Sequence, residues 1–267
     1  SSGFWLPAPG FCLQGGAPML APLILALALL PQLVNKTTPP TTQPPDPALT
    51  PDKRADIYMA RKMYREAAEA YQESLKTNPK SHLLHNKLGI AYHQQMQLDQ
   101  AKRYYERAMK LHRNYSEAIN NVGTIHYARG SYRRAISTYK KALQISPNSA
   151  SIHSNLGTAY FARKRYKEAT EEYLVALKLD PEVFEHRSSF GSMLQERTVQ
   201  DRAKFHYYMA KTYAAAGYFD RALAYLRKAL EEGFKEKDKI IDQVEFAALK
   251  DNPEFQQLLA SNVHVIP

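Results

Sequence analysis

Small and aromatic residues recur every 34 residues between residues 48 and 183 of the chain. Units that start at Ala48, His82, Ser116 and Ala150 align without gaps in their second halves. The matching columns are Ala67, Ala101, Ala135 and Ala169; Tyr71, Tyr105, Tyr139 and Tyr173; and Ser74, Ala108, Ala142 and Ala176. Within a unit these positions are i, i+4 and i+7, which is one face of an α-helix. The period therefore predicts tandem helical units that bury their apolar faces against one another.

The first half of each unit has columns of its own, which predict a second helix. Small residues occupy one column, and mostly aromatic residues follow three positions later: Ala55, Gly89, Gly123 and Gly157, then Tyr58, Tyr92, His126 and Tyr160. Small residues allow two helices to approach closely. Pro79, Pro147 and Pro181 follow the second helix, where proline can end a helix without breaking an internal hydrogen bond. Each unit is therefore predicted to be a helix-turn-helix.

These motifs resemble the tetratricopeptide-repeat (TPR) family. The first helices read NKLGIAY, NNVGTIHY and SNLGTAYF, and the second helices that follow read DQAKRYYERAMKL, RRAISTYKKALQI and KEATEEYLVALKL. Four repeats span residues 48–183, and a fifth at residues 203–236 has Ala210, Tyr213, Ala222, Leu226 and Ala229 in register. The resemblance implies an all-α fold, a right-handed superhelical solenoid of helix-turn-helix repeats, that binds other proteins and is not an enzyme.

The segments between and after the repeats have weaker patterns. Residues 184–202 form an insertion, and we expect its part after Met193 to lengthen the first helix of repeat five. Within residues 237–267, the stretches 238–249 and 253–262 are predicted to be two short helices, the second opened by Pro253. Phe246 and Phe255 would cover the apolar end of the array, as solenoids require.

The N-terminal part differs sharply from the repeats. Residues 1–35 contain no Asp, Glu, Lys, Arg or His, and residues 19–34 are almost all apolar. A helix of that length spans about 24 Å, less than the roughly 30 Å of a bilayer's hydrocarbon core. We expect residues 1–36 to be a retained hydrophobic anchor, or alternatively a signal segment, which would make the protein membrane-associated or exported. The Thr/Pro-rich residues 37–51 are predicted to be an extended linker.

The resemblance implies that the first helices line a concave groove. Its outward positions combine uncharged polar and aromatic side chains, which suit an extended peptide: Asn86, Ile90, His93, Asn120, Thr124, Tyr127, Ser154, Thr158, Phe161, Lys204, Tyr207 and Lys211.

Asn121 and Asn155 lie two residues before the repeat glycine. In the repeats of O-linked GlcNAc transferase, which this pattern resembles, such asparagines hold a peptide backbone. A structural hydrogen bond between neighbouring repeats would explain them equally well. Ser151 and Asn155 stand where a chaperone-type carboxylate clamp has cations, which argues against that clamp.

Positive charge is concentrated in the middle third of the chain. The whole chain has a formal net charge of +10. The second helices of repeats two and three carry a predicted basic patch: Lys102, Arg103, Arg107, Lys110, Arg133, Arg134, Lys140 and Lys141. It is either an ordinary solvated face or a surface for an acidic protein, an anionic membrane or nucleic acid. The patch lacks the row of stacking aromatic residues expected of a single-strand RNA reader, which argues against nucleic acid.

No pattern indicates catalysis, a cofactor, a metal or a small-molecule substrate. Cys12 is the single cysteine, so no disulfide framework or cysteine-built zinc site is expected. His85, His153 and His206 share one repeat column, which indicates packing, although His82 and His85 have a spacing that could bind a metal. The chain has no phosphate-binding loop, nucleophile elbow or HExxH motif.

We predict a tethered scaffold that holds subunits of a membrane- or surface-associated assembly, with protein partners that include a membrane-embedded subunit or further copies of itself. The alternative is a self-associating protein that forms an oligomer or filament through its N-terminal extension.

Overall fold

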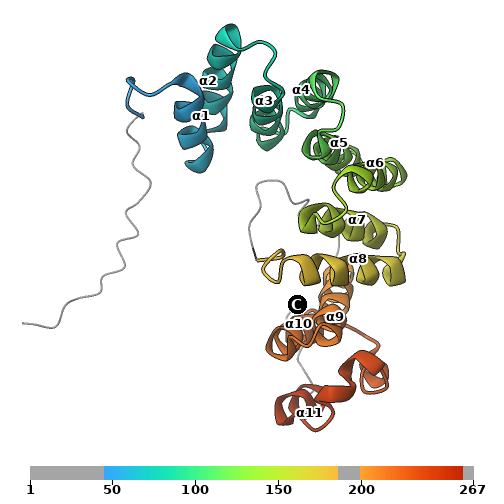
Figure 1. Ribbon diagram of the computed structural model, residues 1–267. Coiled ribbons are helices and arrows are strands. Elements are labelled where there is room, and N and C mark those ends of the chain that lie inside the picture. The colour runs from blue at the N-terminus through green and yellow to red at the C-terminus, as the bar shows by residue number, and fades with distance from the viewer. Residues whose placement is uncertain (1–44, 186–198, 261–267) are drawn as a thin grey trace, which may run out of the picture. The chain divides into compact units, whose positions relative to one another are not determined.

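The computed structural model describes residues 45–185 and 199–260. All regular secondary structure in these ranges is helical (Figure 1). The α-helices are α1 (Pro51–Ala60), α2 (Tyr64–Thr77), α3 (His82–Gln94), α4 (Leu98–Leu111), α5 (Ser116–Ala128), α6 (Tyr132–Ile145), α7 (Ala150–Ala162), α8 (Tyr166–Leu179), α9 (Val199–Ala215), α10 (Phe219–Glu231) and α11 (Pro253–Ala260). Two 3₁₀ helices, η1 (Lys237–Lys239) and η2 (Val244–Leu249), lie between α10 and α11. No strand occurs in these two ranges.

Consecutive helices form the pairs that the repeat period predicts. Each of the five odd-numbered helices from α1 to α9 packs on the helix that follows it, and each pair packs on the next pair. In addition, α5 contacts both α3 and α7, whereas any contact between α4 and α6 is smaller than either of these. Helices α3, α5 and α7 therefore lie closer to one another than α4 and α6 do. The predicted all-α solenoid of helix-turn-helix repeats is confirmed.

The turn inside each pair repeats the same backbone geometry. Each of the five intra-pair turns has one residue with positive φ: Lys62, Met96, Gly130, Lys164 or Gly217. A sixth such residue, Gly233, follows α10. This left-handed conformation favours glycine because a Cβ crowds the backbone there. The solenoid nevertheless places Lys62, Met96 and Lys164 in it, since the packing of the two helices on either side determines the turn.

Helix starts agree closely with the unit starts taken from the sequence. Helices α3, α5 and α7 begin at His82, Ser116 and Ala150. Helix α1 begins at Pro51, later than Ala48, because proline is favoured in the first turn and Thr50 takes the N-cap position. Helix α9 has 17 residues, against 13 in α3, α5 and α7, so it starts before repeat five as expected. Residues 186–198 of the insertion, the expected anchor at residues 1–36 and residues 37–44 of the expected linker lie outside the described residues. The described end of that linker is not extended as predicted, because the Leu49 N–H donates to the Asp46 carbonyl in a turn and Pro51 already belongs to α1.

The C-terminal segment differs from the prediction of two short helices. In place of one helix over residues 238–249 the chain forms η1 and η2, and α11 ends at Ala260, the last residue described. The buried residues Ile240, Phe246 and Leu249 are spaced by multiples of three, which matches the 3₁₀ period and not the 3.6 of an α-helix. Phe246 and Phe255 are fully buried and join the core formed by repeats three to five. None of the helices in the described ranges has both the length and the apolar character to cross a bilayer.

Candidate functional site

The contact between a glycine and a tyrosine sets how closely the two helices of a repeat approach. A Cβ added at Gly89, Gly123 or Gly157 would lie 2.5–2.6 Å from the ring of Tyr105, Tyr139 or Tyr173 respectively. Those three rings are fully buried. In repeats two to four the tyrosine ring therefore requires glycine at this position, and the contact fixes how α3, α5 and α7 present their side chains.

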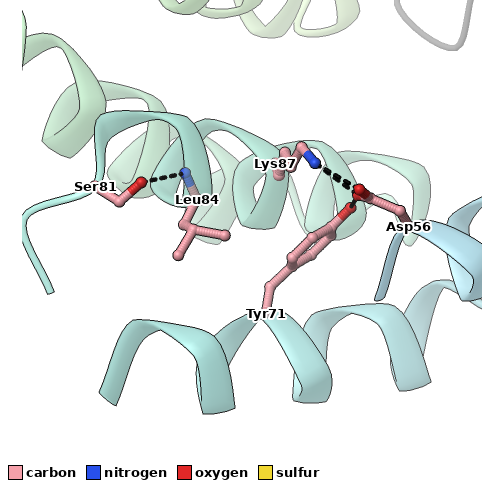
Figure 2. Close-up of polar contacts among 5 residues, drawn as sticks. All are labelled: Asp56, Tyr71, Ser81, Leu84 and Lys87. Carbon is pink, nitrogen blue, oxygen red and sulfur yellow. Dashed lines mark hydrogen bonds and ion pairs between the residues drawn. The ribbon is translucent and has the colours of Figure 1, made fainter. Parts of the chain in front are cut away.

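The tyrosine hydroxyls explain one column of the predicted groove. Tyr139 and Tyr173 donate to Thr124 and Thr158 Oγ1, at 3.4 and 3.3 Å. In repeat one, the corresponding acceptor is a carboxylate of Asp56, to which Tyr71 donates (Figure 2). Thr124 and Thr158 are buried, so they stabilise the helix pair in addition to any role toward a ligand.

In repeat two the same position holds Ile90, which offers no acceptor. The buried hydroxyl of Tyr105 accordingly has no hydrogen-bond partner among the described residues. Burial raises the pKa of the Tyr105 hydroxyl well above its usual range, so it stays protonated. This repeat lacks a hydrogen bond that its neighbours make.

A side chain on each of α3, α5 and α7 donates to the preceding repeat. Asn121 Nδ2 donates to Asn86 Oδ1 and Asn155 Nδ2 to Asn120 Oδ1, both at 3.0 Å. The equivalent residue of α3, Lys87, donates to Asp56 at 2.7 Å; Figure 2 shows its ammonium and the Tyr71 hydroxyl converging on this carboxylate. The asparagines are buried, and Asn155 is only 1% exposed. Of the two explanations that the sequence leaves open, the geometry supports the bond between repeats.

The fourth junction replaces this polar contact with aromatic stacking. Tyr208 is the residue of α9 equivalent to Asn155, and its ring stacks on Tyr166 with centroids 4.6 Å apart. Phe161 lies edge-on to Phe205 at 5.5 Å, and Lys204 Nζ lies 4.8 Å above the Tyr166 ring. The sequence analysis did not identify Tyr166 as a residue of this junction. The signal was present, because Tyr64, Tyr132 and Tyr166 open their second helices at the same repeat position.

The predicted groove residues divide by exposure. Ten are buried: Asn86, Ile90, Asn120, Asn121, Thr124, Tyr127, Asn155, Thr158, Phe161 and Tyr207. Four are partly exposed: His93, Ser154, Lys204 and Lys211. Lys211 Nζ lies 3.2 Å from a carboxylate oxygen of Glu245 and 2.7 Å from Gln243 Oε1, so it binds the C-terminal segment. Much of this row therefore joins repeats and helices to one another.

The histidine column has structural partners. His85 Nε2 donates to the carbonyl of Pro79 at 3.0 Å, and His153 Nε2 donates to that of Pro147 at 2.9 Å. Each bond holds the loop that enters the repeat. The Nδ1 atoms of His153 and His206 lie 2.6 and 2.7 Å from Glu172 and Glu232. Within the described residues, no group of three or more His, Cys, Asp or Glu side chains could hold a metal ion.

The predicted basic patch lies on α4 and α6, where most of its side chains are exposed. Arg103, Arg107 and Lys110 are exposed on α4, and Lys102 is partly covered beside Glu106, 3.6 Å away. Helix α6 carries Arg133, Arg134, Lys140 and Lys141, all exposed, and no acidic residue. The structure therefore brings the eight residues onto two second helices of adjacent repeats.

Comparisons with known proteins agree with this geometry. One family model described as TPR repeat matches residues 55–95 and 123–163, and two models described as tetratricopeptide repeat match residues 84–115 and 150–183. A comparison with curated proteins gives no match.

Solved structures with a similar fold share little sequence with the chain. PilF of Pseudomonas aeruginosa has a TM-score of 0.51 and 16% identity over 78% of this chain and 86% of its own. MamA of Desulfovibrio magneticus RS-1 has a TM-score of 0.47 and 18% identity over 68% of this chain and 92% of its own. YrrB, described as a TPR protein with an unusual peptide-binding site, has a TM-score of 0.43 and 17% identity over 70% and 86%. At these identities the likeness concerns the fold alone. With its repeat columns, its helix pairs and the family models in agreement, the chain belongs to the tetratricopeptide-repeat family.

Proposed function

We propose that this protein is a non-catalytic scaffold that binds protein partners through its repeats while its N-terminal segment tethers it to a membrane. The observation that carries the scaffold is the series of five helix pairs from α1 to α10, joined at each junction by side-chain contacts. Such an array holds long rows of side chains at fixed spacing, which is how repeat proteins bind extended partners. Its buried polar groups are largely engaged in holding the array together.

The tether is supported by the composition of the N-terminal segment. Residues 1–35 lack acidic and basic side chains, and residues 19–34 are almost entirely apolar. Burial of apolar area stabilises by roughly 25 cal/mol per Å², so 16 such residues supply far more than stable attachment needs. The nine residues of the linker that precede the turn at Asp46–Leu49 would span up to about 28 Å as polyproline II. That length would hold the repeats clear of the bilayer surface.

Flotation with phosphatidylcholine and phosphatidylglycerol vesicles tests the tether. The full chain should float with the vesicles, and a chain that begins at residue 37 should remain in solution with unchanged helicity. Ile24→Lys with Leu27→Lys provides a full-length control, since each lysine at the centre of an apolar segment costs about 2.5–3.5 kcal/mol of insertion. Binding of the truncated chain to the vesicles would contradict the tether and assign attachment to the repeats.

Purification of the native complex tests the scaffold. Co-eluting chains that remain bound after residues 1–36 are removed would support partner binding by the repeats. A light-scattering mass of the isolated full chain separates this proposal from self-association. A defined oligomer that dissociates when residues 1–36 are deleted, with no other chain in the native complex, would favour the self-associating protein instead.

A further inference from the structure

The exposed cations of α4 and α6 have few acidic partners. On α4, Arg103, Arg107 and Lys110 occupy i, i+4 and i+7, which is one helix face. On α6, Arg133 and Lys140 are likewise seven residues apart, with Arg134 and Lys141 beside them. Within the parts of the chain that the structure describes, no carboxylate forms an ion pair with Arg103, Arg107, Lys110, Lys140 or Lys141. A surface of unpaired cations attracts anions more strongly than one whose charges are already neutralised.

The two groups of cations belong to one region of positive potential. His126, on α5, has a pKa below its ordinary value, chiefly because it is partly buried and further because Lys102, Arg134 and Arg129 lie near it, which together outweigh the opposing effect of Glu106. These cations come from α4, from α6 and from the end of α5. Cations of α4 and of α6 therefore both lower the pKa of the His126 imidazole, and α5, which carries it, lies between those two helices in the sequence.

The flanking second helices limit the extent of this surface. Helix α2 carries Glu66, Glu69 and Glu73 against two basic residues, and α8 carries Glu168, Glu171 and Glu172 against two. A 14-residue helix is about 21 Å long, so the basic surface is roughly as long as six or seven residues of an extended chain. A planar anionic bilayer or a long nucleic acid would also approach the acidic side chains of α2 and α8. A short segment would not.

Four of the seven exposed cations are arginines, and this bears on the partner. The planar guanidinium donates two parallel hydrogen bonds to a carboxylate, whereas a lysine ammonium acts as a point charge. Arg103, Arg107, Arg133 and Arg134 are exposed and able to form such pairs. We propose that the outer faces of α4 and α6 bind a short acidic segment of a protein partner. This inference rests on the scaffold function proposed above and assigns it a surface and a partner chemistry.

Fluorescence polarisation with the full chain and a labelled peptide of six glutamates tests the proposal, with a peptide of six glutamines as the neutral control. The glutamate peptide should bind, with an affinity that falls as salt rises from 50 to 300 mM because ions screen exposed charges. Arg103→Glu with Arg107→Glu should weaken binding at least tenfold. Lys167→Glu with Lys178→Glu on α8 changes the net charge equally and should weaken it less than threefold. Because all four residues are exposed, both variants should keep the helicity and melting temperature of the parent chain.

Several outcomes would overturn the proposal. Equal losses in the two charge-reversed variants would show attraction by net charge alone, and equal binding of the two peptides would show that carboxylates are not recognised. The chain that begins at residue 37 should also be tested with single-stranded RNA and with anionic vesicles. If it binds either of them, loses that binding in Arg103→Glu/Arg107→Glu and does not bind the glutamate peptide, the surface belongs to that partner instead. Failure of the scaffold function would look different: the native complex would contain no partner, whatever the peptide result.

Discussion

At the residue scale, the columns of the repeat have chemically distinct tasks. The glycine of repeats two to four faces a tyrosine ring, and in repeats three and four the threonine after that glycine accepts a hydrogen bond from the tyrosine hydroxyl. The first contact depends on the absence of a Cβ, and the second depends on a hydrogen-bond acceptor. Substituting Gly123 and Thr124 of α5 one at a time therefore measures the contribution of close packing and that of the hydrogen bond separately.

Replacing Gly123 should destabilise the protein more than replacing its neighbour Thr124. The Cβ of Gly123→Leu would lie 2.5 Å from the Tyr139 ring, and overpacking of this kind costs about 1–3 kcal/mol or more. Thr124→Ala removes a long hydrogen bond of 3.4 Å, worth about 1 kcal/mol. Thermal unfolding followed by circular dichroism measures the difference. Equal melting temperatures would show that α5 and α6 can separate without cost.

Removing a tyrosine hydroxyl should have opposite consequences in repeats two and four. Tyr173→Phe loses the bond to Thr158 and should destabilise by about 1 kcal/mol. Tyr105→Phe removes a buried hydroxyl that has no partner in the described residues, so it should be neutral or stabilising. Urea unfolding of both variants compares the free energies. Ile90→Thr, which offers Tyr105 an acceptor, should make Tyr105→Phe destabilising, and an unchanged effect would contradict this account.

At the element scale, the asparagine contacts join one first helix to the next. Asn121 and Asn155 donate to residues 35 positions earlier, so each bond crosses a repeat boundary. At the junction between repeats four and five, Tyr208 of α9 stacks on Tyr166 of α8 instead. The junctions therefore differ in chemistry although the helices that they join share one pattern.

A double-mutant cycle on Asn86 and Asn121 should reveal coupling of about 1 kcal/mol. Each single alanine variant should destabilise by about 1–3 kcal/mol, because it leaves the facing buried amide without its partner. The double variant should lose less than the sum of the singles, since both ends of the bond are then removed. Urea unfolding provides the free energies. Additive losses would mean that the 3.0 Å contact contributes nothing to stability and would reopen the peptide-ladder interpretation.

At the scale of the whole molecule, the array needs a closed end. Repeats three to five share one core with Phe246 and Phe255 of the C-terminal segment. Lys211 on α9 reaches Glu245 and Gln243 of the same segment. Without this cover the apolar face of repeat five would meet water, as in any solenoid that lacks a capping element.

Truncating the capping phenylalanine should destabilise the array more than any exposed change in the same segment. Phe246→Ala removes a fully buried ring and should cost about 3–5 kcal/mol. The matched control is Val244→Ala, two residues away and 80% exposed, which should change stability by less than about 0.5 kcal/mol. Differential scanning calorimetry compares the two. Similar melting temperatures would show that the C-terminal segment does not stabilise the repeats.

The sequence alone determined the repeat period, the all-helical class, the starts of α3, α5 and α7, and the column of small residues where two helices approach. These features are local and periodic, so one helix face read along the chain contains them. Only the tertiary structure decided which partner each polar side chain takes. Asn121 meets Asn86 and Thr124 meets Tyr139 because of how helices pack across and within repeats, and neither contact follows from the periodicity of a single helix. The 3₁₀ segments were decided in the same way, because burying Ile240, Phe246 and Leu249 against repeat five outweighed the helical pattern of residues 238–249.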